Sequence, residues 1–167
     1  QRIYAQKPIY IGFYILYNNI IKGFCCQRDL QNLSISSKYG NEERMVFPMK
    51  KVSFIVLGAG QRGNAYSKYA AEHPERMEIV GVAEPIDERR NAFKEKYHVP
   101  EENCALDWKD LLARPKMADA AIISMQDQMH YEPALKAIEL GYHLLLEKPM
   151  ATTPEECLAI ARAAEKK

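Results

Sequence analysis

The stretch that decides the fold is VSFIVLGAGQRG, residues 52–63. Its first six residues are a short, apolar run rich in β-branched side chains, which predicts a strand buried on both faces of a parallel sheet. The glycines break this run, and residues 64–72 then predict a helix. A strand, a glycine turn (residues 58–63) and a helix in this order form the first part of a βαβ unit.

Further strands and helices alternate along the rest of residues 49–167. We expect strands at 78–83, 104–106, 118–125 and 142–146, and helices at 87–97, from Asp107, at 131–140 (ended by Gly141) and from Pro154. Thr153 and Glu156 are predicted to form a capping box around Pro154, which suits a first helical position. The alternation predicts an α/β fold of Rossmann type, a doubly wound parallel sheet.

The glycine turn has the spacing GxGxxG and a defined context. It follows a strand, opens a helix, and is followed 21 residues after its last glycine by Glu84, at the end of the second strand. This context predicts a dinucleotide-binding fingerprint, with an ordinary tight turn as the alternative. Gly58 permits the tight turn, Gly60 lets a pyrophosphate approach the backbone, and Gly63 lets helix and strand pack closely.

Glu84 is the residue expected to select the cofactor. A carboxylate at this position accepts hydrogen bonds from both ribose hydroxyls and repels a 2′-phosphate, so NAD is favoured over NADP. Arg89 and Arg90 lie in the next helix and could reach such a phosphate. The alternative for these two arginines is a solvated helix face.

A second motif, Glu147-Lys148-Pro149, follows the fifth strand. Ligands of open α/β sheets lie beyond the carboxyl ends of the strands, so Lys148 is expected in the same crevice as the glycine turn. There its ammonium group can bind a substrate hydroxyl or carboxylate and stabilise charge that develops during hydride transfer. The alternative is a solvated loop.

Four segments together resemble the Gfo/Idh/MocA family, the glucose–fructose oxidoreductase and inositol dehydrogenase group. They are GAGQRG (58–63), VAEP (82–85), the turn at 127–130 and LLEKPMATTPEE (145–156), and the likeness covers essentially all of 49–167. The resemblance implies pyrophosphate contacts at Gly58, Gly60, Gln61, Arg62 and Gly63, a ribose contact at Glu84, nicotinamide contacts at Ser124 and His130, and a border between nicotinamide and substrate at Glu147 and Lys148.

Two positions after the fourth strand leave alternatives open. Met125-Gln126 replaces the Thr-Pro often found there in the family, which leaves the local cofactor contacts uncertain. His130 is either a nicotinamide contact or a helix-start residue whose ring is satisfied by the backbone.

The resemblance also implies an activity. It is hydride transfer between a nicotinamide cofactor and a sugar or polyol hydroxyl, with Lys148 as the catalytic residue. Family members carry a second α/β domain that forms the substrate pocket, so we expect this chain to be a fragment that does not turn over substrate alone, and the complete protein to be a homo-oligomer. The alternatives are an NAD-dependent glycoside hydrolase and a non-catalytic NAD-binding or scaffold protein.

Composition excludes several classes of partner. The 23 basic and 22 acidic residues give a net charge of +1, which offers no field for nucleic acid or a membrane surface. No uncharged apolar run reaches the 18 residues of a membrane-spanning helix. The four cysteines form no CxxC or zinc spacing, so we expect free thiols in a reducing cytoplasm and no metal.

Residues 1–48 differ from the rest in composition. Ile, Tyr and Asn supply 16 of these 48 residues, and their apolar residues keep neither a helical nor a strand period for long. We expect a non-native or poorly structured extension, read through from upstream DNA, with Met49 as the natural start. The alternatives are a signal or anchor, for which residues 23–26 match a cleavage site poorly, and a genuine extra hairpin or docking segment.

Overall fold

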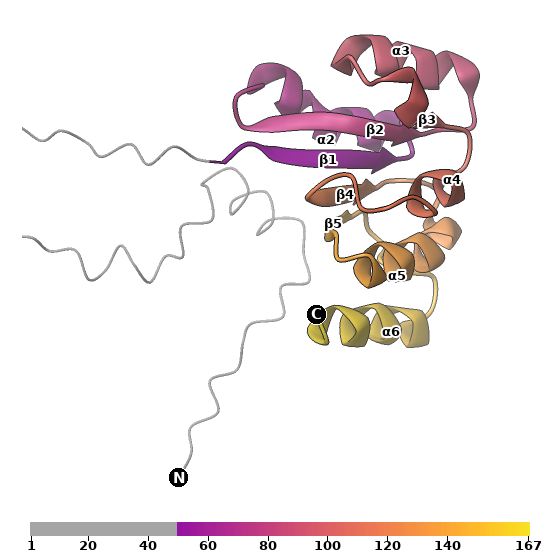
Figure 1. The fold of residues 1–167 in the computed structure, drawn as a ribbon. Coiled ribbons are helices and arrows are strands. Elements are labelled where there is room, and N and C mark those ends of the chain that lie inside the picture. Colours follow the sequence, from indigo (N-terminus) through magenta and orange to yellow (C-terminus); the bar gives the residue numbers. More distant parts are fainter. Residues whose placement is uncertain (1–49) are drawn as a thin grey trace, which may run out of the picture. The chain divides into compact units, whose positions relative to one another are not determined.

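The structure, a computed structural model, describes residues 50–167, so the expectation for residues 1–48 lies outside it. Its strands are β1 (Val52–Leu57), β2 (Met77–Ala83), β3 (Cys104–Ala105), β4 (Ala120–Ile123) and β5 (His143–Leu146). All neighbouring strands are parallel, and their order in the sheet is β3-β2-β1-β4-β5 (Figure 1). The predicted doubly wound α/β fold is confirmed.

Helices connect the strands and fall into two groups. Their bounds are α2 (Gln61–Glu72), α3 (Asp87–Tyr97), α4 (Trp108–Leu112), α5 (Tyr131–Glu139) and α6 (Pro154–Glu165), with short 3-10 turns η1 (Glu101–Asn103) and η2 (Asp127–Met129). Helices α2 and α3 contact each other and β2, whereas α4 contacts α5, and α6 packs on α5 (Figure 1).

The central strand β1 packs on both of its faces. Ile55 and Leu57 belong to one apolar cluster with residues of α4, α5 and α6. Phe54 and Val56 point to the opposite face, because side chains alternate along a strand. All four are at most 1% exposed, which confirms the prediction of a strand buried on both sides.

The ends of several elements differ from the prediction. Helix α2 begins at Gln61 and not at Asn64, because the last three residues of the glycine turn already form its first turn. Strand β4 is paired on both sides only over Ala120–Ile123, which is shorter than the predicted 118–125. The predicted capping box of α6 is confirmed, since the Glu156 N–H donates to the Thr153 hydroxyl and the Thr153 N–H donates to the Glu156 carboxylate.

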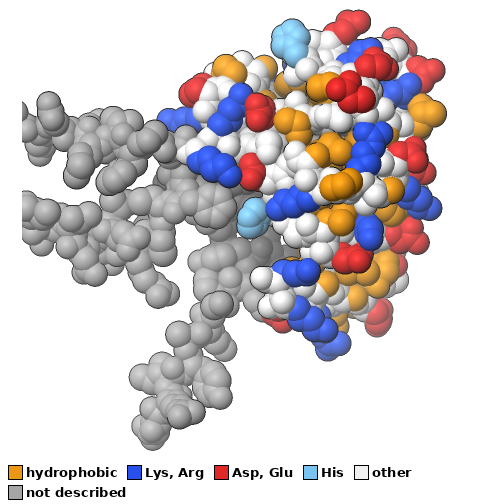
Figure 2. Space-filling view, in the orientation of Figure 1, with side chains coloured by type: hydrophobic (Ala, Val, Ile, Leu, Met, Phe, Trp, Pro, Cys, Tyr) orange, Lys and Arg blue, Asp and Glu red, His pale blue; other side chains and the backbone are white. Residues whose placement is uncertain are grey.

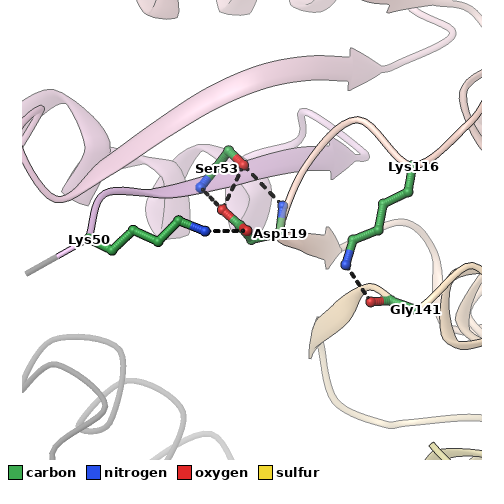
Figure 3. A network of polar contacts seen from close by, with 5 residues as sticks. All are labelled: Lys50, Ser53, Lys116, Asp119 and Gly141. Atoms are coloured by element: carbon green, nitrogen blue, oxygen red, sulfur yellow. Dashed lines mark hydrogen bonds and ion pairs between the residues drawn. The ribbon is translucent and has the colours of Figure 1, made fainter.

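At the amino edge of the sheet, Ser53 of β1 is hydrogen-bonded to Asp119, the residue just before β4 (Figure 3). The Asp119 carboxylate accepts hydrogen bonds from the Ser53 N–H at 3.0 Å and the Ser53 hydroxyl at 2.9 Å, and the Lys50 ammonium lies 3.4 Å away. These donors, the Ser53 N–H foremost, hold the pKa of Asp119 below its usual value. A second contact in Figure 3 joins the Lys116 ammonium to the Gly141 carbonyl at 2.6 Å.

The surface of this unit is mixed in charge. On the face shown in Figure 2, basic and acidic side chains are interspersed with apolar ones. Within residues 50–167, no helix is both long enough and apolar enough to cross a membrane.

Candidate functional site

Four residues that follow different strands form a row at the carboxyl edge of the sheet. The last paired residues of β2, β1, β4 and β5 lie side by side in the register. The residue that follows each of these strand ends donates its backbone N–H to a carbonyl of the neighbouring strand, at 2.8–3.0 Å. This carboxyl-edge row consists of Glu84, Gly58, Ser124 and Glu147. The order of the strands reverses between β1 and β4, so the row crosses the point where open α/β sheets bind ligands.

The glycine turn requires two of its glycines for its own packing. Gly58 has a φ of +98°, and a Cβ there would lie 2.9 Å from the backbone of Ser124. A Cβ on Gly63 would lie 2.1 Å from the Gly58 carbonyl oxygen. Gly60 is different, because a Cβ there would meet nothing within 4 Å. Nothing in the described residues therefore requires a glycine at position 60, and the space beside it is open.

Helix α2 begins at this open space. Its N-cap is Gly60, without a side-chain cap, and its first turn has no acidic residue. The unpaired N–H groups and the positive end of the helix dipole are thus left for an anion. Gln61 and Arg62, in the same turn, are both exposed.

Asn64 is a residue of the turn that sequence reasoning missed. Its side-chain amide donates to the carbonyls of Ala59, at 2.7 Å, and Gly60, at 3.1 Å. These bonds fix the backbone of the glycine turn from within. The signal in the sequence was a short amide side chain directly after the turn, because such side chains commonly bond to nearby backbone.

Glu84 contacts the turn from the neighbouring strand. It is 4% exposed, and its carboxylate accepts hydrogen bonds from the N–H of Ala59 at 2.8 Å and of Ile86 at 3.2 Å. Each carboxylate oxygen can accept a further bond. Glu84 therefore braces the glycine turn, and its contact with a ribose stays a prediction.

Arg90 is held beside Glu84. Its guanidinium donates to the Glu84 carbonyl at 2.7 Å and forms an ion pair with Asp87. The side chain is only 15% exposed, so the prediction of a solvated face is wrong for Arg90. Arg89, one residue earlier, is exposed.

Glu147 carries a buried carboxylate that is only partly paired. Its side chain is 8% exposed, and one oxygen lies 3.9 Å from the Arg62 guanidinium, which comes from the glycine turn. The other oxygen is buried and has no hydrogen-bond partner. A buried acceptor without a donor is costly, so this oxygen fits a donor from a ligand.

The remaining predicted residues differ in their exposure to solvent, and Ser124 is half-buried. Lys148 is exposed, and within residues 50–167 its ammonium has no hydrogen bond or ion pair. The Ser124 hydroxyl donates to the Gly58 carbonyl at 2.9 Å, so it also holds the glycine turn. His130 is fully buried, with Nδ1 2.8 Å from the Pro149 carbonyl and Nε2 3.2 Å from the Met125 carbonyl. Both ring nitrogens face backbone carbonyls, so the ring offers no nitrogen to a ligand.

All the predicted site residues thus lie at or next to the carboxyl edge, on the segments that follow β1, β2, β4 and β5. In the part of the chain that the structure describes, no three His, Cys, Asp or Glu side chains are grouped to hold a metal ion. Burial raises the pKa of the Cys104 thiol, which fits an unreactive cysteine.

Residues 52–167 match the model of the Gfo/Idh/MocA family, described as an oxidoreductase family with an NAD-binding Rossmann fold. The chain belongs to the Gfo/Idh/MocA family. The resemblance drawn from its motifs is therefore confirmed, and these residues are an NAD-binding Rossmann fold.

Individual family members are similar over the same region. D-glucoside 3-dehydrogenase of Escherichia coli K12 is 30% identical over an alignment of 117 positions, and the match covers 66% of this chain and 31% of that protein. A glycosyl hydrolase family 109 protein of Shewanella sp. W3-18-1 is 31% identical over an alignment of 123 positions, and the match covers 70% of this chain and 26% of that protein. This chain spans between a quarter and a third of the length of these relatives.

A solved structure agrees with the fold. The WlbA dehydrogenase of Chromobacterium violaceum, crystallised with NADH and UDP-GlcNAcA, has a TM-score of 0.64 and 27% identity. The match covers 73% of this chain and 35% of that protein.

Proposed function

We propose that this chain binds NAD as the cofactor domain of a dehydrogenase, which transfers hydride between the nicotinamide and a sugar or polyol hydroxyl. The observation that carries the proposal is the unpartnered, buried oxygen of Glu147. Glu147 belongs to the same carboxyl-edge row as Gly58, and Gly58 lies two residues before Gly60, where the space is open. A dinucleotide supplies both an anion for the uncapped helix and hydrogen-bond donors for the carboxylate.

The glycine turn holds the pyrophosphate in this proposal. Backbone N–H groups of Gly60, Gln61 and Arg62 donate to it, and the exposed Arg62 guanidinium adds positive charge. Ser124 and Asn64 keep the turn in its bound shape through their hydrogen bonds to its carbonyls.

The choice of NAD over NADP rests on Glu84 and Arg90. The two backbone donors on the Glu84 carboxylate keep it in place, where its charge repels a 2′-phosphate. Arg90, which could have bound that phosphate, is already engaged by the Glu84 carbonyl and by Asp87. Both features favour the free ribose hydroxyls of NAD.

The reactive end of the site is Glu147 and Lys148. When bound, the nicotinamide supplies the hydride chemistry. The Lys148 ammonium, exposed and unpaired among the described residues, would bind the reacting hydroxyl of the substrate and stabilise the negative charge that develops on its oxygen. In the oxidation direction the carbon would give up its hydride to the nicotinamide, and the hydroxyl proton would leave to solvent. The Glu147 carboxylate accepts a hydrogen bond at its free oxygen.

Calorimetry on the chain itself tests the proposal. We expect NAD to bind, NADP to bind more weakly, and Gly60→Val to bind neither. If the wild-type chain, folded by circular dichroism, binds no nicotinamide dinucleotide, the proposal fails.

The 31% identical glycosyl hydrolase supports a second candidate, a glycoside hydrolase that uses NAD. In that case the hydride would return to the sugar within each cycle. Product analysis of the complete protein separates the two, because only a dehydrogenase accumulates NADH in proportion to product.

A further inference from the structure

The ring of His130 joins two loops at the carboxyl edge. It stands at the N-cap of α5, fully buried, between the Met125 carbonyl after β4 and the Pro149 carbonyl after β5. The 2.8 Å contact from Nδ1 to Pro149 is the shorter of the two, and the Nε2 contact to Met125 is 3.2 Å. A neutral ring has one N–H, so the distances favour a proton on Nδ1 that is donated to Pro149.

The position of Lys148 depends on the contact between His130 and the Pro149 carbonyl. Its own side chain has no hydrogen bond or ion pair to the rest of residues 50–167, so its backbone alone positions it. On one side, the Glu147 N–H is tied to the Ile123 carbonyl at 2.9 Å as part of the sheet ladder. On the other side, the Pro149 carbonyl is tied to His130. The first anchor belongs to the sheet, and the second is a single side chain.

We propose that His130 is a positioning residue for the loop Glu147–Pro149: by donating from Nδ1 to the Pro149 carbonyl, it fixes the backbone that presents Glu147 and Lys148 to the nicotinamide end of the cofactor. The proposal rests on the proposed function for what the loop presents. The contact that holds the loop, from His130 to the Pro149 carbonyl, is independent of that function. It differs from a direct contact, because the ring has no polar atom left for a ligand.

Two matched variants separate the two ring nitrogens. The side-chain amide of Asn places its nitrogen close to the position of Nδ1, whereas Gln reaches toward the position of Nε2. His130→Asn should therefore keep the bond to Pro149, and His130→Gln should lose it. Both variants put an amide into the same buried site, so a general cost of burial affects both.

The chain of 167 residues is used for three measurements. In His130→Gln, amide hydrogen exchange across residues 148–151 should be faster while that of β1 is unchanged, and His130→Asn should stay near wild type. NADH affinity should fall about two- to tenfold in His130→Gln, the range of one lost hydrogen bond, while ADP-ribose, which lacks the nicotinamide, should bind as before. The imidazole nitrogen NMR signals of wild type should show a proton on Nδ1.

Each result has a defined meaning. Equal behaviour of the two variants, equal losses for NADH and ADP-ribose, or a ring protonated only at Nε2 would overturn the positioning role. The NMR measurement uses wild type alone, so it decides the question even where a variant does not fold. Absence of NADH binding to wild type would instead count against the proposed function, and the exchange and NMR data would still test His130.

Discussion

The carboxylate of Glu84 accepts a buried 2.8 Å hydrogen bond from the backbone N–H of Ala59. This bond ties the end of β2 to the glycine turn after β1, and a hydrogen bond to a charged acceptor contributes about 1.5–3 kcal/mol. The residue expected to choose the cofactor is therefore also part of the frame that holds the turn. A substitution that deletes the side chain removes the charge and both backbone hydrogen bonds, whereas an amide removes the charge and keeps one of the two acceptor oxygens.

Glu84→Gln should narrow the preference for NAD over NADP. The amide keeps an acceptor for the turn but no longer repels a 2′-phosphate, so we expect the ratio of the two dissociation constants to shrink about tenfold or more. Calorimetry with both dinucleotides measures it. Glu88→Gln is the control, since it removes the same charge from an exposed position in the first turn of α3. Equal affinity of wild type for both cofactors would refute the selector role and direct attention to Arg89.

Gly60 and Gly63 should respond to substitution in opposite ways. Gly60→Val adds a side chain in open space, so stability should change by less than about 1 kcal/mol while NAD binding is lost. Gly63→Ala places a Cβ 2.1 Å from the Gly58 carbonyl, so it should unfold at a lower temperature. Thermal unfolding and calorimetry on both variants provide the comparison. Normal NAD binding by Gly60→Val would show that the pyrophosphate does not use this space.

Lys148→Ala should affect chemistry more than cofactor binding. In a longer protein that carries this domain, loss of the charge that we propose to stabilise the transition state should lower turnover about 100- to 1,000-fold. NAD affinity should change little, because we expect the glycine turn and Glu84 to provide most of the contacts to NAD. Steady-state kinetics measures the turnover, and calorimetry measures the NAD affinity. Unchanged turnover would mean that residues 147–149 are only a connector, in line with a non-catalytic NAD-binding protein.

The Ser53–Asp119 contact should make stability depend on acid pH. Because hydrogen bonds hold the pKa of Asp119 low in the folded chain, its contribution is present above the ordinary pKa of about 3.9 and is lost as the pH falls below that value. Asp119→Ala should thus be less stable than wild type at pH 7, and the difference should shrink as the pH falls from about 4 toward the lower pKa of Asp119 in the folded chain. Ser53→Ala, which retains the backbone donor, should show a smaller loss. A difference that stays constant with pH, measured by urea unfolding, would contradict this reasoning.

Removing residues 1–48 should leave residues 49–167 stable. The apolar residues of the removed segment keep neither a helical nor a strand period for long, so we expect its loss to change the free energy of unfolding of residues 49–167 by less than about 1 kcal/mol. Urea unfolding of the full and shortened chains gives the comparison. A loss of several kcal/mol would indicate that the segment packs on the sheet.

Local patterns predicted most of the fold, whereas hydrogen bonds between residues far apart in the sequence were not predictable. The apolar run of β1 and the capping box at Thr153 depend on residues within a few positions of one another, and both are confirmed. The contact between His130 and Pro149 spans 19 residues, and that between Ser53 and Asp119 spans 66. Such pairs form only when the sheet brings separate strands into register, which no local spacing records. For the same reason, the bond from the Ala59 N–H to the Glu84 carboxylate, which spans 25 residues, was not expected.

The carboxyl-edge row has a consequence for how this domain can change over time. Its four members each end a different strand, and their alignment depends only on the sheet register. Insertions in the helices or in their outer connections leave the alignment intact, whereas one residue added inside β1 would turn its side chains to the opposite face and displace Gly58. The lengths of the peripheral segments can therefore change, whereas Gly58 cannot be exchanged without moving the backbone of Ser124, its neighbour in the row.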